Sequence, residues 1–261
     1  MTNGTDILIP LGQGSRHDNL ELRYCLRSIE KHLIGVRNVF IVGDKPEWLR
    51  GVVYIPERDN PNNWMRAHNI YRKIMAGIKF SFINLSAKPS VNKFEVFDLE
   101  LSDNFLFMND DHFLLTDYVA GEFPYYHRGA VDLQALEHHK PQQLQMANTA
   151  YMLEDNAFLD FDIHCPVVYN KRLFQNIFSR LPEKWPEYGY GIKSFYNNQG
   201  CDITNWAPCE DLKFSEPAMK ESIYRLLEGR PWFSIGDRCL KSGGMKEVLQ
   251  ELYPDKSKYE L

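Results

Sequence analysis

The stretch that decides the fold is residues 104–115, which read Asn-Phe-Leu-Phe-Met-Asn-Asp-Asp-His-Phe-Leu-Leu. An apolar run typical of a buried strand is interrupted by Asn109, Asp110 and Asp111 and then resumes. Two adjacent carboxylates at the end of a buried strand cost several kcal/mol of desolvation and repulsion unless a counter-charge lies between them. Mg²⁺ and Mn²⁺ prefer carboxylate oxygens and often bring phosphate with them. We therefore predict a metal site that serves a nucleotide-activated substrate. The alternative is an Asp-rich turn between two hairpin strands.

The residues before this stretch alternate between strand and helix patterns. The apolar spacing predicts strands at 6–11, 39–42, 52–55 and 105–108 and helices at 20–33 and 67–78. This order indicates an α/β fold with a mixed, mostly parallel sheet flanked by helices. Ligands bind beyond the carboxyl ends of the strands in such sheets. We therefore expect the loops at Gly12, Asp44, Pro56 and Asp110 to meet in one crevice.

The second half of the chain has a less regular pattern. It predicts helices at 170–181, 216–227 and 245–252 and a strand at 231–235. Residues 120–162 are rich in aromatic residues, His and Gln, and we interpret them as an irregular segment that covers the crevice. We predict a single domain over 1–261, with a nucleotide-binding half (1–119) and an acceptor and catalytic half (120–261).

Composition excludes several classes of protein. The chain has 261 residues, of which 44 % are hydrophobic and 25 % charged, so it can bury one substantial core. Its net charge is −5 and no basic stripe is visible, which argues against nucleic-acid binding. The five cysteines are odd in number and never form a Cys-x-x-Cys pair, so structural zinc and a disulfide framework are not expected. With neither a signal peptide nor a transmembrane segment in the pattern, we expect a cytoplasmic protein.

Two further sites carry side chains suited to catalysis. His164, in His-Cys-Pro, is a candidate general base or phosphate contact, although a lone His is more often hydrogen-bonded within a partly buried loop. Asp237 follows the apolar stretch Trp232–Ile235 and could complete a metal shell, with Arg238 beside it to meet a phosphate. The alternative for these two residues is a turn before the last helix.

Basic and amide side chains near the expected crevice are candidates for substrate binding. Arg23 lies on the first helix, and Arg66 and Asn69 open the second, where the helix dipole favours an anion. Lys193 lies in a glycine- and tyrosine-rich stretch with the composition of a mobile lid. The full set of candidate substrate-binding residues is Leu11, Gly12, Arg23, Asp44, Arg66, Asn69, Asn109, Lys193 and Arg238.

These pieces resemble, in order, the conserved regions of the Stealth family. The blocks that carry the resemblance are Glu21–Lys31, Val39–Val42, Phe107–Asp111, His164–Pro166 and Phe233–Asp237. Stealth proteins are sugar-1-phosphate transferases of bacterial capsular polysaccharide synthesis and of lysosomal-enzyme tagging. The resemblance implies a GT-A-like fold and attack by a hydroxyl of a glycan acceptor on the β-phosphorus of a UDP-sugar, with Mg²⁺ or Mn²⁺ as cofactor and release of UMP. It implies that Asp110 and Asp237 hold the metal, that Asp111 joins them or accepts a proton, and that His164 is the base or a phosphate contact.

The chain also departs from the Stealth pattern. Pro10–Ser15 stands where the family carries a Trp-Val-Asp/Asn-Gly-x-Asp motif, and Gly236 stands where it has Asn. An Asp-bearing strand end is also found in GT-A glycosyltransferases, in which UDP leaves instead of UMP. Glycosyl transfer therefore stays open as an alternative, and a non-catalytic, glycan-binding descendant is a second one.

Overall fold

The central sheet has five strands, and all but one are parallel. The computed structural model describes residues 4–13, 17–84, 100–137, 140–155, 157–200, 205–241 and 243–261. The strands lie in the order β4 (Val53–Pro56), β3 (Val36–Gly43), β1 (Thr5–Leu11), β5 (Asn104–Phe107) and β9 (Val167–Asn170). Only β9 runs antiparallel, against β5. The predicted mixed, mostly parallel α/β sheet is confirmed.

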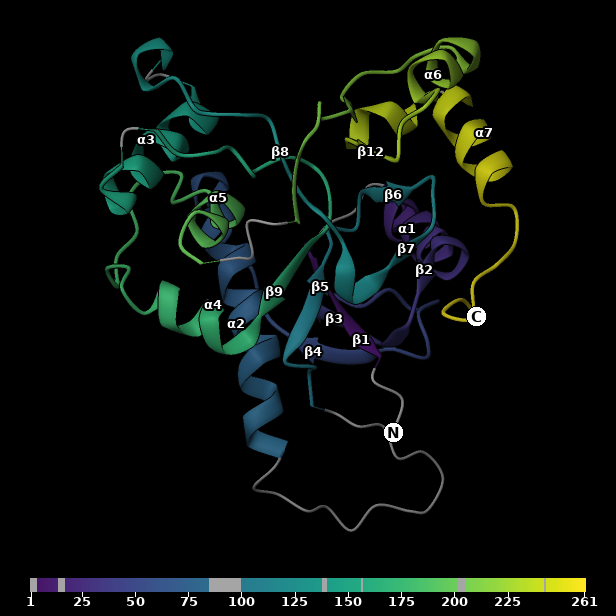
Figure 1. Cartoon of the computed structure of the whole chain (residues 1–261). Helices are drawn as coiled ribbons and strands as arrows, with labels where there is room; N and C mark the ends of the chain where they lie inside the picture. Colours follow the sequence, from purple (N-terminus) through teal and green to yellow (C-terminus); the bar gives the residue numbers. More distant parts are fainter. Residues whose placement is uncertain are drawn as a thin grey trace.

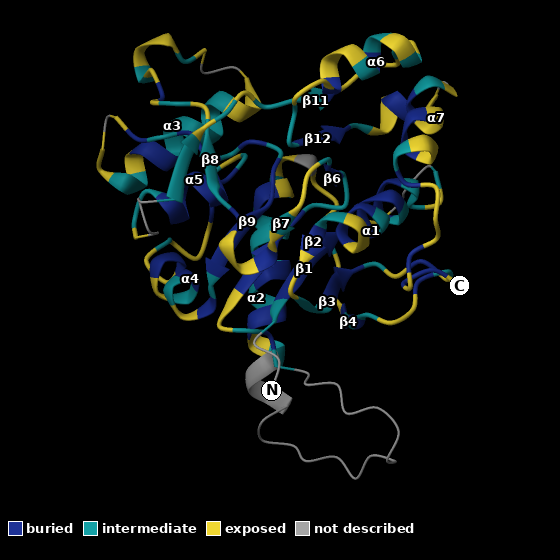
Figure 2. Cartoon of the chain, turned by 45° about the vertical axis from the view of Figure 1, so that its right-hand side comes forward, coloured by how far each residue is buried: buried dark blue, intermediate teal, exposed yellow. Residues whose placement is uncertain are grey.

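Helices cover both faces of this sheet because its strands are apolar on both sides. The helix on one face is α1 (Leu20–His32), and those on the other are α2 (Arg66–Asn84), α4 (Lys171–Phe178) and α5 (Ile192–Asn197) (Figure 1). Successive side chains of a strand point to opposite faces. On β1, Ile7 and Ile9 accordingly pack in the core that holds α1, whereas Leu8 packs in the core that holds α2. Figure 2 shows buried residues gathered in these strands and on the inner sides of the helices.

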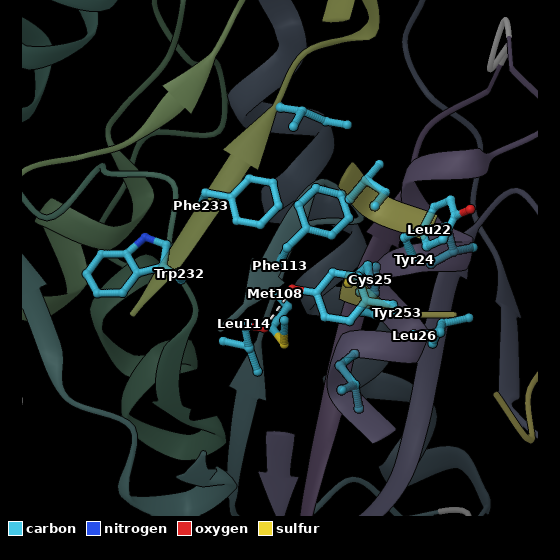
Figure 3. Close-up of a cluster of buried hydrophobic side chains, with 14 of the residues drawn as sticks. Leu22, Tyr24, Cys25, Leu26, Met108, Phe113, Leu114, Trp232, Phe233 and Tyr253 are labelled. Carbon is cyan, nitrogen blue, oxygen red and sulfur yellow. Dashed lines mark hydrogen bonds between the residues drawn. The ribbon is translucent and has the colours of Figure 1, made fainter. Parts of the chain in front are cut away.

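A second, three-stranded sheet lies beyond the carboxyl end of β5. It consists of β11 (Lys213–Phe214), β12 (Trp232–Ile235) and β6 (His112–Leu114), beside α6 (Lys220–Leu227) and α7 (Gly243–Leu252). Phe113 and Phe233 stack across β6 and β12 with ring centroids 4.9 Å apart (Figure 3). The Tyr253 hydroxyl donates to the Leu114 carbonyl at 2.7 Å. Because β5 pairs in one sheet and β6 in the other, 109–111 form the junction between two sheets and not a hairpin turn.

Residues 120–162 are more ordered than the sequence suggested. They contain α3 (Pro141–Leu153) and β8 (Tyr125–His127), which pairs with β10 (Trp206–Pro208). Just before them, β7 (Tyr118–Val119) pairs with β2 (Leu33–Ile34). The prediction of an irregular segment is wrong for α3, whose apolar residues do not concentrate on one face. In the part of the chain that the structure describes, no helix is long and apolar enough to cross a membrane.

The last residues of the chain are fastened to α1 by a buried ion pair. The fully buried carboxylate of Glu260 accepts hydrogen bonds from Arg27 at 2.7 and 2.8 Å and from Arg23 at 3.3 Å. Burial alone would raise the pKa of Glu260, but the bonds from Arg27 and from the Ser257 backbone outweigh it and lower the pKa to about 2. The C-terminal segment thereby holds α1 in place.

This ion pair predicts acid-sensitive stability. Because the folded-state pKa of Glu260 lies below its ordinary value of 4.5, the stabilisation is complete above about pH 4.5 and is lost as the pH falls toward 2. We expect Glu260→Gln to lower the free energy of unfolding by about 2 kcal/mol at pH 7, because it leaves Arg27 unpaired. Urea unfolding between pH 3 and 7 measures this, with the exposed Glu183→Gln as control. Equal stability of the two variants at pH 7 would contradict the prediction.

Candidate active site

The two carboxylates at the end of β5 lie in a crowded acidic cluster. Burial and the neighbouring carboxylates of Asp111 and Glu21 raise the pKa of Asp110 to about 7. Glu21, at the start of α1, also has its pKa raised to about 7, first by burial and then by Asp237 and Asp111. We call Glu21, Asp110, Asp111 and Asp237 the acidic cluster. Glu21, which the sequence reasoning did not assign, therefore interacts with all three predicted metal ligands.

Topology explains this convergence. Asp110 and Asp111 follow β5, and Asp237 begins the 3₁₀ helix η5 (Asp237–Lys241) directly after β12. Because β12 pairs with β6, the end of β12 lies beside the β5–β6 junction, and the Ile235 amide donates to the Asp111 carbonyl at 3.4 Å. Glu21 opens α1, which packs against β6.

Asp111 has a different environment at each carboxylate oxygen. Its Oδ2 is 3.1 Å from the ammonium group of Lys213 on β11. Its Oδ1 is buried and has no hydrogen-bond partner among the described residues, and the nearest ring nitrogen, His112 Nε2, lies 3.8 Å away. His112 is fully buried, and burial together with the charges of Lys193, His164 and Lys213 lowers its pKa well below the usual value. The His112 ring is therefore neutral at pH 7.

His164 forms a hydrogen-bonded pair with Asp211. His164 Nδ1 lies 2.7 Å from Asp211 Oδ2, and the His164 backbone amide donates to Asp211 Oδ1 at 3.1 Å. Burial would raise the pKa of Asp211, but the hydrogen bond and charge of His164 outweigh it and hold the pKa below the ordinary value. The carboxylate fixes the orientation of the ring, which is the arrangement expected of a general base. Sequence reasoning missed Asp211, which is 47 positions away and lies in no motif.

The carboxyl ends of β1 and β3 meet, as expected for a parallel pair, and a buried lysine supports them. Lys73 on α2 donates to the Leu11 carbonyl at 2.7 Å and contacts Asp59 at 2.7 Å. Its positive charge also acts to lower the pKa of Asp110, a member of the acidic cluster. Gly43, at the end of β3, has a φ of +129°, and a Cβ there would lie 2.0 Å from the Leu11 carbonyl oxygen, so only glycine fits.

The other predicted substrate-binding residues on this side border the same loops. Gly12 is exposed after β1, and Asp44 is half-buried after β3, with its amide donating to the Leu11 carbonyl. The side chain of Asn69 accepts from the Asn60 amide and donates to the Asn60 carbonyl, and thus holds the loop before α2. Arg66 begins α2 and is exposed.

Three predicted substrate-binding cations have protein partners in this structure. Arg23 pairs with Glu260 and lies 4.3 Å over the Trp48 ring, and Arg238 pairs with Glu216 at the surface. Lys193 is buried in α5, and its ammonium donates to the Ile163 and Cys165 carbonyls at 2.6 and 2.5 Å. Its segment is a buried helix in place of the expected lid.

Asn109 shapes the junction with its backbone. Its amide donates to His112 Nδ1 at 3.2 Å, and its carbonyl accepts from the His112 amide at 3.3 Å. The Cys25 thiol, 3.6 Å from the same carbonyl, also donates to it. Cys25, Cys165, Cys209 and Cys239 are free thiols, and Cys201 lies outside the described residues.

The donor set of the acidic cluster suits a hard divalent cation. No group of three or more His, Cys, Asp or Glu side chains in the described residues is already arranged to hold a metal ion. The carboxylates of the cluster nevertheless repel one another without enough positive charge beside them to balance it. Neighbouring carboxylates help to raise the pKa values of Asp110 and Glu21, and one oxygen of Asp111 has no hydrogen-bond partner among the described residues. Carboxylate oxygens are the ligands that Mg²⁺ and Mn²⁺ prefer, and a cation would relieve this repulsion.

Comparison with known proteins gives a partial match. No protein-family model matches the chain. The N-acetylglucosamine-1-phosphotransferase subunits alpha/beta of Homo sapiens and of Mus musculus are each 34 % identical to it over 116 residues. The match covers 43 % of this chain and only 8 % of each relative.

Among solved structures, galactosyltransferase LgtC in complex with donor and acceptor sugar analogs aligns over 97 % of both chains, at 12 % identity and a TM-score of 0.46. Mouse xyloside xylosyltransferase 1 aligns over 98 % of this chain and 96 % of its own, at 7 % identity and a TM-score of 0.33.

The raised pKa of Asp110 predicts that its replacement stabilises the fold. The ionised carboxylate is disfavoured in the folded state, so its cost is complete above about pH 7 and fades as the pH falls toward 4. In the absence of metal, we expect the free energy of unfolding of Asp110→Asn to be about 2 kcal/mol higher than that of the wild type at pH 8. The difference should be smaller at pH 5. Urea unfolding in EDTA measures this. A variant less stable than the wild type at pH 8 would refute it.

Proposed function

We propose that this protein is a nucleotide-sugar-dependent transferase that moves a sugar-1-phosphate group to a hydroxyl of a glycan, as Stealth proteins do. The observation that carries the proposal is the match to the N-acetylglucosamine-1-phosphotransferase subunits, whose name states this chemistry. The acidic cluster supports it. A diphosphate donor is negatively charged, and the carboxylates at the end of β5 could hold the metal ion that neutralises this charge.

The proposed reaction is a displacement at phosphorus. The oxygen of the acceptor hydroxyl forms a bond to the β-phosphorus of the donor, and the bond from that phosphorus to the bridging oxygen breaks. UMP leaves with the bridging oxygen, and the product is a phosphodiester. The hydroxyl proton passes to His164 Nε2, while Asp211 holds Nδ1. Asp111 is a weaker candidate for the base because Lys213 pairs with it.

Mg²⁺ or Mn²⁺ completes the proposed site. Asp110, Asp111 and Asp237 would hold the cation, which would neutralise charge on the diphosphate when bound. In the proposed division of labour, residues 1–119 bind the nucleotide, with Gly12, Asp44 and the start of α2 at its border. The remaining residues supply His164 and the acceptor side.

Two alternatives predict different products. A glycosyltransferase would attack the anomeric carbon and release UDP with a glycoside. A non-catalytic, glycan-binding descendant would release no nucleotide.

The nucleotide released identifies the reaction. The full chain is incubated with a panel of UDP-sugars and other nucleotide sugars, Mg²⁺ or Mn²⁺, and candidate glycan acceptors, and the nucleotide products are separated by chromatography. We expect UMP from the wild type and a loss of at least about 100-fold in Asp111→Asn. UDP would show glycosyl transfer, and neither product across the acceptor panel would support the binding protein.

The His164–Asp211 pair offers a matched test of the base. We expect His164→Ala and Asp211→Asn each to lower kcat by about 10²- to 10⁴-fold, the second because an Asn amide that donates to Nδ1 would hold the ring in the wrong tautomer. His32 forms a similar pair with Asp117, at 2.8 Å, on the far end of α1. His32→Ala is therefore the control and keeps wild-type kcat. Wild-type kcat in His164→Ala would remove this residue from the mechanism.

A further inference from the structure

Lys213 pairs with Asp111 of the acidic cluster and was not among the residues that the sequence predicted for the site. It lies on β11, and its ammonium is 3.1 Å from Asp111 Oδ2. The Lys213 side chain is 28 % exposed and that of Asp111 is 19 % exposed, so the pair is partly shielded from water. A partly buried pair is screened less than a surface pair and has a larger influence on what else binds the carboxylate.

The second oxygen of Asp111 is not neutralised. Oδ1 is buried without a hydrogen-bond partner among the described residues. His112 Nε2, which faces it at 3.8 Å, is also buried and without a partner there. Because the Asn109 amide donates to His112 Nδ1, the neutral ring carries its proton on Nε2. Asp111 thus has one ammonium on one side and a distant N–H on the other, which is incomplete compensation for a carboxylate at a sheet junction.

Lys213 also reaches the Asp237 side of the acidic cluster. A Cβ placed on Gly236 would lie 4.0 Å from Lys213 Cε, so the lysine stem runs past the backbone that precedes Asp237. A single ammonium on a flexible stem therefore lies at the Asp111 carboxylate, where a divalent ion would compete with it. Lysine suits such exchange because its charge sits at the end of a mobile stem.

We propose that Lys213 is the resting counter-cation of Asp111, which a divalent ion displaces, and that the released ammonium then binds a phosphate oxygen of the donor. The first step requires only that a divalent ion binds Asp111, whereas the second rests on the proposed function. Lys213 thereby links metal binding to donor binding.

Mn²⁺ titration tests the displacement without any substrate. Free Mn²⁺ is measured by electron paramagnetic resonance with the full chain as wild type, Lys213→Met, Lys213→Gln, Lys213→Arg and Lys220→Met. Lys220 pairs with Glu251 at the surface, so its replacement removes an equivalent lysine outside the cluster. We expect the Met and Gln variants at 213 to bind Mn²⁺ about three- to tenfold more tightly, and the other two to match the wild type within about twofold.

Two results would overturn the displacement: equal Mn²⁺ affinity of the wild type and both neutral variants, and no Mn²⁺ binding by any folded protein in the set. The thermal unfolding midpoint shows which variants are folded. Because two neutral variants at position 213 are used, the test still works if one of them does not fold.

Titration with UDP at saturating Mn²⁺ tests the second step. We expect Lys213→Met to bind UDP about tenfold more weakly and Lys213→Arg to retain most of the affinity. Equal UDP affinity in Lys213→Met and the wild type would overturn the phosphate contact. If no variant binds UDP while the Mn²⁺ result holds, the proposed nucleotide function fails, and Lys213 stands as the counter-cation alone.

Discussion

The rest of the site depends on negative charge that is confined to the junction between two sheets. β5 and β6 belong to different sheets, and the residues that join them carry Asp110 and Asp111 into a region already occupied by Glu21. Carboxylates held together with little water repel each other and favour protonation or a bound cation. A fold that keeps them there gives up stability, which is typical of functional sites.

Apolar packing on both sides of the junction holds these carboxylates in place. The aromatic residues of β6 and β12 form a rigid layer next to the cluster, and the C-terminal segment fixes α1 through Glu260 and Arg27. Groups that must stay close despite repulsion need such a scaffold, since interactions among the charges alone would separate them. The two cations differ in how firmly they are held: Lys73 is buried between two oxygen atoms, whereas Lys213 is partly exposed at the end of its stem.

His164 belongs to the second half of the chain and the acidic cluster mainly to the first. The charge of His164 is one of those that lower the pKa of His112, which follows Asp111 in the chain. In the proposed reaction, His164 would act as the base and the acidic cluster would hold the metal ion. In the proposed mechanism, proton transfer and diphosphate binding would fall to separate structural elements.

The sequence by itself determined the main elements of the first half of the chain and the place of the key carboxylates. Apolar periodicity is local, so the β1, α1, β3, α2 and β5 segments and the Asp pair at the end of β5 could be predicted from neighbouring residues. Only the tertiary structure shows that β9 runs antiparallel, that α3 forms a helix and that Glu21 joins the acidic cluster. The same is true of the pairs Asp211–His164 and Lys213–Asp111, whose members lie 47 and 102 positions apart. Contacts over such separations are decided by how the sheets pack, and they leave no periodic trace in the chain.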